Sequence, residues 1–170
     1  FVDANTPGLN LGEPEKKMGW KGSDTRSIFF DNMKIPSTNI LGNTQKGFNQ
    51  FLETLTGGRI TIAALALGIS QGAYNLALNY SQEREAFGKK INKFQGVSFK
   101  LADMATQIEA TRHMVYNTAW LKDNNNSIIK EAAMAKLFSS EVAMKITTEA
   151  IQIHGGYGYI REYNVERFFR

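Results

Sequence analysis

The sequence contains no cysteine and only two histidines, and both shortages restrict the chemistry that it can carry. Without cysteine there is no disulfide, no thiolate nucleophile and no cysteine-ligated metal. The two histidines, His113 and His154, are too few for a histidine-rich metal centre. We therefore expect a reducing compartment and no metal site.

Long apolar runs and a strong excess of one charge are also missing. The longest apolar run, IAALALGI at residues 62–69, is far shorter than the ~20 residues that span a bilayer. Nothing in the sequence resembles a signal peptide. The net charge is +4, from 20 Lys and Arg against 16 Asp and Glu, and the basic residues are spread along the chain. Neither a membrane span nor nucleic-acid binding is expected, whereas small anionic ligands are compatible with this charge.

Proline is confined to the first 36 residues, which divides the chain into two parts. In the first part, the segment SIFFDNMKI (27–35) reads as a strand between turn-rich stretches. The proline-free remainder favours long helices. We predict the end of a β-domain over 1–43 and a helical bundle over 44–170. Both termini look cut, so we expect a piece of a longer protein whose fourth helix is incomplete.

Three apolar repeats, at 60–80, 97–119 and 135–153, have apolar residues mostly three or four positions apart and predict long helices. The first repeat is rich in alanine, so a neighbouring helix could approach it closely. Residues 87–96 interrupt the pattern and are predicted to be a loop, and Ser127 is a candidate N-cap of the third helix. The predicted fold is mainly α, an antiparallel helical bundle preceded by a small β remnant.

Several polar residues are candidates for ligand binding, and each also has a purely structural interpretation. Arg84 follows the first long helix, where the helix dipole favours a cation with or without a ligand. Gln95, beside an aromatic in the predicted loop, suits the edge of a flat heterocycle, but a surface glutamine usually has no such role. The same holds for Gln152 on the third helix. The segment TGGR (56–59) reads as the head of a long helix, which is either an anion site or a loose helix start.

The segment IQIHGGYGYI (151–160) raises a more specific question, because three glycines fall within four positions directly after a predicted helix. Glycine commonly ends helices, but bare backbone also allows a ligand to lie against the main chain. Tyr157 and Tyr159 are more often core residues than ligand-stacking ones. His154 has no acid or second histidine beside it in sequence, so we expect a structural rather than a catalytic role.

The order of these motifs resembles the acyl-CoA dehydrogenase family. The stretch SQEREAFGKKINKFQG (81–96) is similar to that family's R-x-x-F-G and x-x-Q signature, and AIQIHGGYGY (150–159) is similar to its Q-x-x-G-G-x-G-Y signature. Upstream, MGWKGSDTRSIFFDNMKIPSTNILG (18–42) resembles the last strands of the family's middle β-domain. The resemblance covers essentially the whole chain, in the family's order.

This resemblance implies a longer flavoenzyme. In that family an N-terminal helical domain and a middle β-domain precede a C-terminal four-helix bundle. FAD lies between the β-domain and the bundle, and the subunits form a homotetramer, a dimer of dimers. The family reaction is α,β-desaturation of an acyl-CoA thioester to a trans-2-enoyl-CoA, with electrons passing to an electron-transferring flavoprotein. Such an enzyme is expected in a bacterial cytoplasm or in the mitochondrial matrix.

Matching to the family's motifs also assigns site residues. The positions that the resemblance places on the FAD of a neighbouring subunit are Arg84, Phe87, Gln95, Gln152, Ile153, His154, Gly155 and Gly156. The positions that it places on the acyl-CoA are Thr56, Gly57, Gly58 and Arg59. On this view Gly155 and Gly156 are bare because the dinucleotide passes close to them, and Arg84 neutralises pyrophosphate charge, a task that suits its planar guanidinium.

No residue of the chain is assigned as the catalytic base. In most family members the base is the glutamate of an E-G-T motif beyond the arginine that matches Arg170, and we expect it there. In a minority the base lies just before the arginine that matches Arg59, where this chain has Gly58. Glu53 and Glu83 are unsupported candidates. We therefore expect residues 1–170 alone to be inactive, and Thr56, where the family often has an acid, to alter contacts with CoA.

The residues leave two alternatives open. One is a flavoenzyme of the same fold with different chemistry, an acyl-CoA oxidase or a flavin monooxygenase. Rapid reaction of the reduced flavin with oxygen would favour it. The other is a non-enzymatic helical module for oligomerisation or DNA binding, which the mild positive charge allows. Strongly salt-dependent DNA binding would favour that reading.

Overall fold

The computed structural model of the protein describes residues 1–170. The chain forms two compact units, residues 1–53 with Arg170, and residues 54–169. The first unit contains β1 (Leu9–Leu11), β2 (Ile28–Phe30) and the short 3-10 helix η1 (Ser37–Asn39). The second unit is helical and carries the candidate site.

The β1 and β2 strands pair in antiparallel fashion, with Leu9 opposite Phe30 and Leu11 opposite Ile28. The strand predicted over 27–35 is therefore confirmed only for its first half. Pairing stops at Phe30, and Asn32 then adopts a left-handed backbone with a φ of 47°. Such a backbone is not compatible with a continuing strand.

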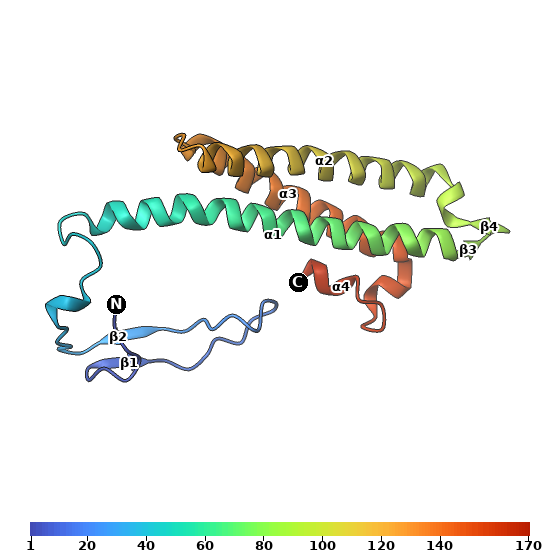
Figure 1. Cartoon of the computed structure of the whole chain (residues 1–170). Helices are drawn as coiled ribbons and strands as arrows, with labels where there is room; N and C mark the ends of the chain where they lie inside the picture. Colours follow the sequence, from blue (N-terminus) through green and yellow to red (C-terminus); the bar gives the residue numbers. More distant parts are fainter. The chain divides into compact units, whose positions relative to one another are not determined.

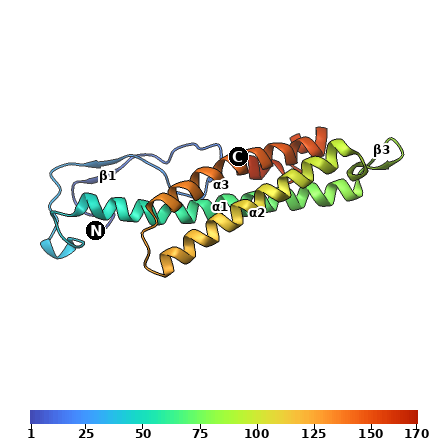
Figure 2. The same cartoon turned by 90° about the horizontal axis from the view of Figure 1, so that it is seen from above.

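The long helices follow in the order that the sequence predicts. α1 (Gly47–Glu83) leads into a hairpin of β3 (Glu85–Ala86) and β4 (Lys89–Lys90), and then into the 3-10 helix η2 (Ile91–Lys93). The remaining elements are α2 (Gln95–Asp123), α3 (Ile129–His154), the 3-10 helix η3 (Gly155–Tyr159) and α4 (Glu166–Phe169). α1, α2 and α3 lie alongside one another, each antiparallel to the one before it (Figures 1 and 2). The predicted mainly helical fold is confirmed.

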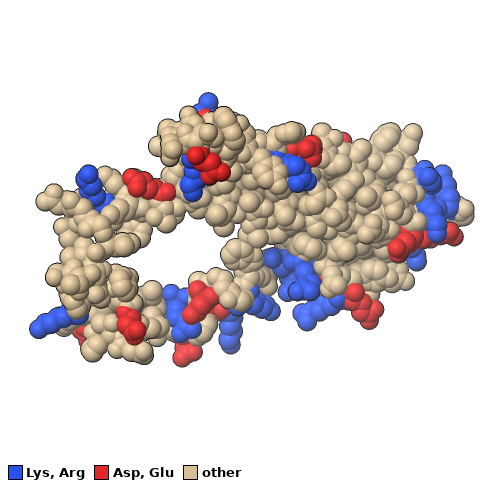
Figure 3. All heavy atoms as spheres, in the orientation of Figure 1, with Lys and Arg blue, Asp and Glu red and all other residues tan.

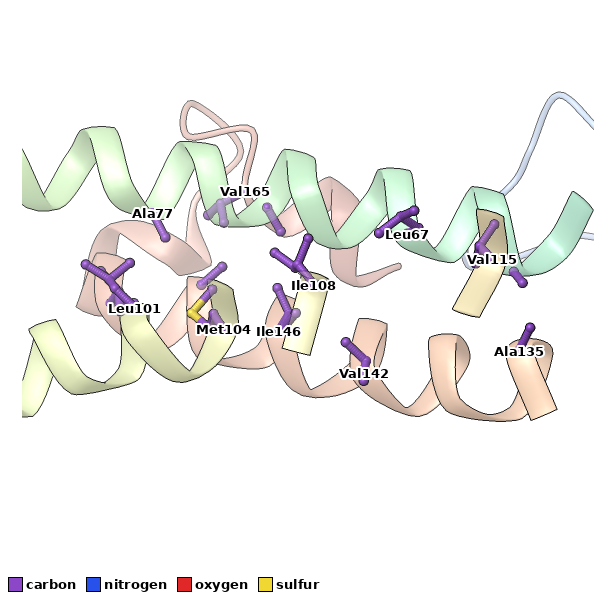
Figure 4. Packing of buried hydrophobic residues seen from close by; sticks show 14 residues of the cluster. Leu67, Ala77, Leu101, Met104, Ile108, Val115, Ala135, Val142, Ile146 and Val165 are labelled. Carbon is purple, nitrogen blue, oxygen red and sulfur yellow. The ribbon is translucent and has the colours of Figure 1, made fainter. Parts of the chain in front are cut away.

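The core of the helical unit is built from one face of each long helix. Figure 4 shows Leu67 of α1, Ile108 of α2 and Ile146 of α3 pointing into the same interior. The buried face of α1 is largely alanine: Ala63, Ala66, Ala73 and Ala77. The close approach that this alanine-rich repeat predicted is not found for α1, because the helices whose backbones approach each other most closely are α2 and α3.

Two expectations about helix boundaries are wrong. α3 begins at Ile129, and its N-cap is Ile128, which makes no side-chain cap hydrogen bond, so Ser127 is not the cap. The predicted loop over 87–96 contains β4 and η2, and Gln95 is the first residue of α2 rather than a loop residue. In both places the local pattern located the break between helices correctly but misplaced the helix start by one or two residues.

The TGGR segment (56–59) is not at the head of a helix. α1 begins at Gly47, so Thr56 to Arg59 lie in its interior, where backbone N–H groups are used by the helix itself. Because the segment is not a helix start, neither the anion site nor the loose helix start that the sequence left open is confirmed. An interior glycine costs about 0.5–1 kcal/mol relative to alanine, and a long packed helix can absorb two of them.

By length and composition alone, α1 is long and apolar enough to cross a membrane. This was not expected, because the longest uninterrupted apolar run is short. The buried residues of α1 belong to the core that it shares with α2 and α3. A core helix of a bundle passes the same test, so the finding is weak evidence for a span.

Candidate functional site

A cavity at the ends of α1 and α3 contains most of the predicted cofactor site. α1 ends at Glu83 and α3 ends at His154, near the β3–β4 hairpin (Figure 1). The cavity has a volume of about 430 Å³. Its lining residues are Tyr80, Arg84, Ile91, Ile153, His154, Gly155, Gly156, Tyr157 and Ile160.

The backbone of Arg84 is held on both sides. Its N–H donates to the Tyr80 carbonyl at 2.8 Å, and its carbonyl accepts from the Ile91 N–H at 2.9 Å. The hairpin between these residues turns at Phe87 and Gly88, with φ of 51° and 79°. Two consecutive positive φ values are typical of a type I′ turn. Phe87 is 96% exposed at this tip, in a conformation that a residue with a side chain rarely adopts.

The Arg84 guanidinium has no carboxylate partner, although Glu83 and Glu85 flank it in sequence. Glu85 instead pairs with Lys90 at 2.8 Å, and that hydrogen bond lowers the pKa of Glu85. The Arg84 guanidinium carbon lies 5.3 Å from the centroid of the Tyr157 ring. Basic side chains gather at the hairpin end of the helical unit, with fewer acidic ones beside them (Figure 3). The wall of the cavity therefore carries a positive charge that the chain itself does not neutralise.

Four aromatic rings join the helix ends behind this cavity. Tyr80 of α1 stacks on His154 of α3, with ring centroids 4.3 Å apart and 19° between the planes. Tyr163 meets the two rings near their edges, at 5.8 Å and 6.1 Å. Tyr157 packs against Tyr163 at 5.1 Å. The stack ties the end of α1 to the end of α3, which fits the structural role expected of His154.

Burial keeps the stacked rings neutral. Burial lowers the pKa of His154, and the hydrogen bond to the Ala150 carbonyl opposes this only in part. The distance from His154 Nδ1 to that carbonyl oxygen is 2.8 Å. Because a carbonyl only accepts, Nδ1 carries the proton and Nε2 the lone pair. Burial also raises the pKa of Tyr80, so that its hydroxyl stays protonated at neutral pH.

The three glycines after α3 are there for different reasons. Gly155 ends the helix with a φ of 59°, which favours glycine. At Gly158 a Cβ would lie 2.4 Å from the Ile151 carbonyl oxygen, so no other residue fits. Gly156 has neither constraint, because its φ is not positive and a Cβ there would meet nothing within 4 Å. The fold requires two of the three, and the third leaves bare backbone on the cavity wall.

The structure brings together only part of the predicted cofactor set. Arg84 and the run from Ile153 to Gly156 line one cavity. Phe87, Gln95 and Gln152 are exposed and do not line it. The TGGR segment lies on α1, which ends directly before Arg84, and is roughly 40 Å from that end at a rise of about 1.5 Å per residue.

Two tyrosines are not the core residues that the sequence suggested. Tyr157 is 41% exposed and Tyr159 is 90% exposed. The glycine-rich backbone of η3 carries these rings at the surface of the unit, where Tyr157 faces Arg84. Tyr80 and Tyr163 are the aromatic residues that sequence reasoning missed. Tyr80 precedes Arg84 by four positions, a helical spacing that could have indicated a shared face, whereas no local signal points to Tyr163.

The different roles of Gly158 and Gly156 can be separated by matched alanine substitutions. We expect Gly158→Ala to lower the free energy of unfolding by about 1–3 kcal/mol, because the new methyl group overlaps backbone. Gly156→Ala should change it by no more than about 0.5 kcal/mol. Urea denaturation of both variants checks this. Equal losses of stability would contradict the assignment.

The buried neutral His154 predicts a loss of stability on acidification. The folded state holds the pKa of His154 below the ordinary value of 6.5, so below that pH the unfolded chain binds more protons than the folded one. The free energy of unfolding should therefore fall as the pH drops from 6.5 toward the lower folded pKa. Urea denaturation at pH 7.5 and 5.5 measures this loss.

His113 supplies the control for this measurement, because it is exposed and lies 3.5 Å from Glu109 rather than in the core. Between pH 7.5 and 5.5, the free energy of unfolding should fall less in His154→Gln than in the unchanged protein. In His113→Gln it should fall as much as in the unchanged protein. An undiminished loss in His154→Gln would show that other groups cause the pH dependence.

Comparison with known proteins gives a consistent result over the whole chain. Residues 45–170 match the family model described as the acyl-CoA dehydrogenase C-terminal domain. The probable acyl-CoA dehydrogenase YngJ of Bacillus subtilis is 53% identical over 170 residues, which are 100% of this chain and 45% of that protein. The caffeyl-CoA reductase-Etf complex subunit CarC of Acetobacterium woodii is 46% identical over the same 100% of this chain and 45% of its own length.

The solved structure of butyryl-CoA dehydrogenase from Megasphaera elsdenii has the same fold, with a TM-score of 0.96 and 48% sequence identity. The match covers 99% of this chain and 44% of that one. The chain thus spans less than half the length of the relatives that it matches. The helical fold, the two motifs and the family match agree, and the chain belongs to the acyl-CoA dehydrogenase family, of which it contains the helical C-terminal domain.

Proposed function

We propose that the whole protein is an FAD-dependent acyl-CoA dehydrogenase that converts acyl-CoA thioesters to trans-2-enoyl-CoA. The observation that carries this proposal is the cavity at the ends of α1 and α3. There the unpaired cation of Arg84 lies on the same wall as the bare backbone of Gly156. A phosphate-bearing ligand suits both features, since it needs positive charge and close access to main-chain groups.

The residues present fit FAD on two counts. A Cβ at Gly156 would fill space that no other part of the chain uses, and Arg84 has no internal carboxylate to satisfy. Arg84 and the run from Ile153 to Gly156 would hold the dinucleotide that serves a neighbouring subunit, since the TGGR segment of their own chain lies roughly 40 Å away. Phe87, Gln95 and Gln152 would contact it from outside the cavity, where their exposed positions leave them accessible. When bound, FAD supplies the acceptor for the hydride that leaves the β-carbon.

The acyl-CoA is assigned to the TGGR segment of α1. Gly57 and Gly58 are half-buried and lie in the interior of a helix, where alanine would be more stable. A Cβ at Gly58 would meet nothing within 4 Å, so the fold gives no reason for this glycine. Thr56 and Arg59 would flank the thioester on the same stretch of helix. No acid lines the cavity at the other end of α1, and the base is proposed to lie beyond Arg170.

Assembly and partners follow from the same proposal. We infer a homotetramer, transfer of electrons to an electron-transferring flavoprotein, and a location in a bacterial cytoplasm or the mitochondrial matrix. CarC, a relative in sequence, is named as a subunit of a complex with Etf, which supports the electron-transferring partner.

Reduction in the opposite direction is a second candidate, because CarC is named as a caffeyl-CoA reductase subunit. In this direction the same cavity would bind FAD, and the same TGGR segment would bind the enoyl-CoA. Rates with acyl-CoA and an artificial electron acceptor, compared with rates for enoyl-CoA and a reduced donor, distinguish the two directions.

The proposed function predicts that full-length protein purifies with bound FAD and is bleached by an acyl-CoA in the absence of oxygen. Bleaching is expected because the substrate reduces the flavin. Absorbance near the flavin maximum measures it. Rapid reoxidation by oxygen after bleaching would identify an acyl-CoA oxidase or a monooxygenase instead, and a full-length protein without flavin would refute the proposal.

In the full-length protein, Gly156→Ala should weaken FAD binding while the free energy of unfolding of the flavin-free form is unchanged.

Gly58→Ala tests the assignment of the substrate. The substitution should raise the free energy of unfolding by about 0.5–1 kcal/mol, because alanine is the better helix former. It should also raise the KM for acyl-CoA, since the new methyl group occupies space next to the thioester. Gly68→Ala is the matched control, because its Cβ would also meet nothing within 4 Å. The control should gain stability without a change in KM, and identical KM values in the two variants would contradict the assignment.

A further inference from the structure

Arg84 is the charged group of the cavity, and its side chain has two described neighbours within the chain, the Tyr157 ring and Tyr80, whose pKa its charge tends to lower against the larger effect of burial. The guanidinium carbon lies 5.3 Å from the centroid of the Tyr157 ring. An arginine side chain has many rotamers, and fixing it for a ligand loses conformational entropy. The neighbouring glutamates do not hold it, because Glu85 pairs with Lys90. Among these neighbours the Tyr157 ring is the one whose face lies against the guanidinium, and we take it to orient this group before a ligand arrives.

The Tyr157 ring is itself held in place from several sides. It packs against Tyr163 at 5.1 Å, and Tyr163 meets the Tyr80–His154 stack near its edges. The backbone on both sides of Tyr157 is constrained as well. Gly155 has a positive φ, and Gly158 lies against the Ile151 carbonyl with no space for a Cβ.

We propose that Tyr157 is a positioning residue, which presents the Arg84 guanidinium to the anionic part of the ligand through the face of its ring. This inference rests on the proposed function, because it takes the ligand to be the phosphate-bearing FAD. The ring holds the cation by its negative face and leaves the N–H groups of the guanidinium free to donate to phosphate oxygens. A carboxylate in the same place would orient Arg84 but would also neutralise its charge. The aromatic ring orients the guanidinium and keeps its charge available.

The ring, rather than the hydroxyl group, is the part that acts. Tyr157→Phe should therefore bind FAD with an affinity within about twofold of the unchanged protein, because the ring face is retained. Tyr157→Leu should weaken binding by about three- to tenfold, the range expected for loss of one cation–π contact. The affinity is measured by titrating FAD into flavin-stripped full-length protein and following the quenching of flavin fluorescence.

A double-mutant cycle separates positioning from a general effect on the fold. If Tyr157 acts through Arg84, Tyr157→Leu should cause no further loss of affinity once Arg84→Met is present. Equal losses in the two backgrounds would overturn the inference and leave Tyr157 a packing residue. Thermal unfolding of the flavin-free variants identifies any loss that comes from the fold alone.

The cycle also distinguishes this inference from the proposed function. If the unchanged full-length protein binds no FAD, the proposed function fails, and the inference fails with it. If the protein binds FAD and Arg84→Met weakens the binding while Tyr157→Leu does not, the inference alone is overturned. We expect Arg84→Met and Tyr157→Leu each to weaken FAD binding. The double variant should bind FAD no more weakly than Arg84→Met alone, and Tyr157→Phe should retain the affinity.

Discussion

The hydrophobic core that α1 shares with α2 and α3 is the constraint on which the candidate site depends. Four of the eight buried residues of α1 are alanine, and Leu67 is the largest buried residue that α1 contributes to the main core cluster. The backbones of α2 and α3 approach each other most closely, and α1 completes the bundle through the side chains that it contributes to the shared core. The end of α1 then reaches the end of α3, and Tyr80 can stack on His154. Bulkier residues on this face would separate the helices, and the cavity would lose one wall.

The cavity combines tightly packed residues with residues that the packing leaves open to a ligand. The aromatic cluster and the fitted glycine at 158 make this end of the unit rigid. The Arg84 guanidinium has no carboxylate partner and the space beside Gly156 is unfilled, which a fold selected for stability alone would not favour. The coexistence of a rigid frame with unsatisfied groups is the physical reason to interpret the cavity as a binding site rather than a packing defect.

The sequence was sufficient for the helical fold and for part of the site, because both depend on local patterns. The repeats at 97–119 and 135–153 correspond to helices whose buried residues follow the predicted spacing. The TGGR segment was misplaced because two glycines look like a helix start, although tertiary packing carries α1 through them. The exposure of Tyr157 and its contact with Arg84 could not be predicted, since they depend on how η3 folds back toward a helix end distant in sequence. The assignments of Phe87, Gln95 and Gln152 to a cofactor stay predictions.

The uninterrupted course of α1 has a consequence for how this domain can change in evolution. Gly58 and Tyr80 belong to one helix with no break between them. A single residue inserted or deleted between them would rotate one end relative to the other by about 100° and shift it by about 1.5 Å. Such a change would turn either the TGGR segment or the cavity wall away from its present direction. Between these points the chain can tolerate exchanges of one residue for another, but its length is fixed.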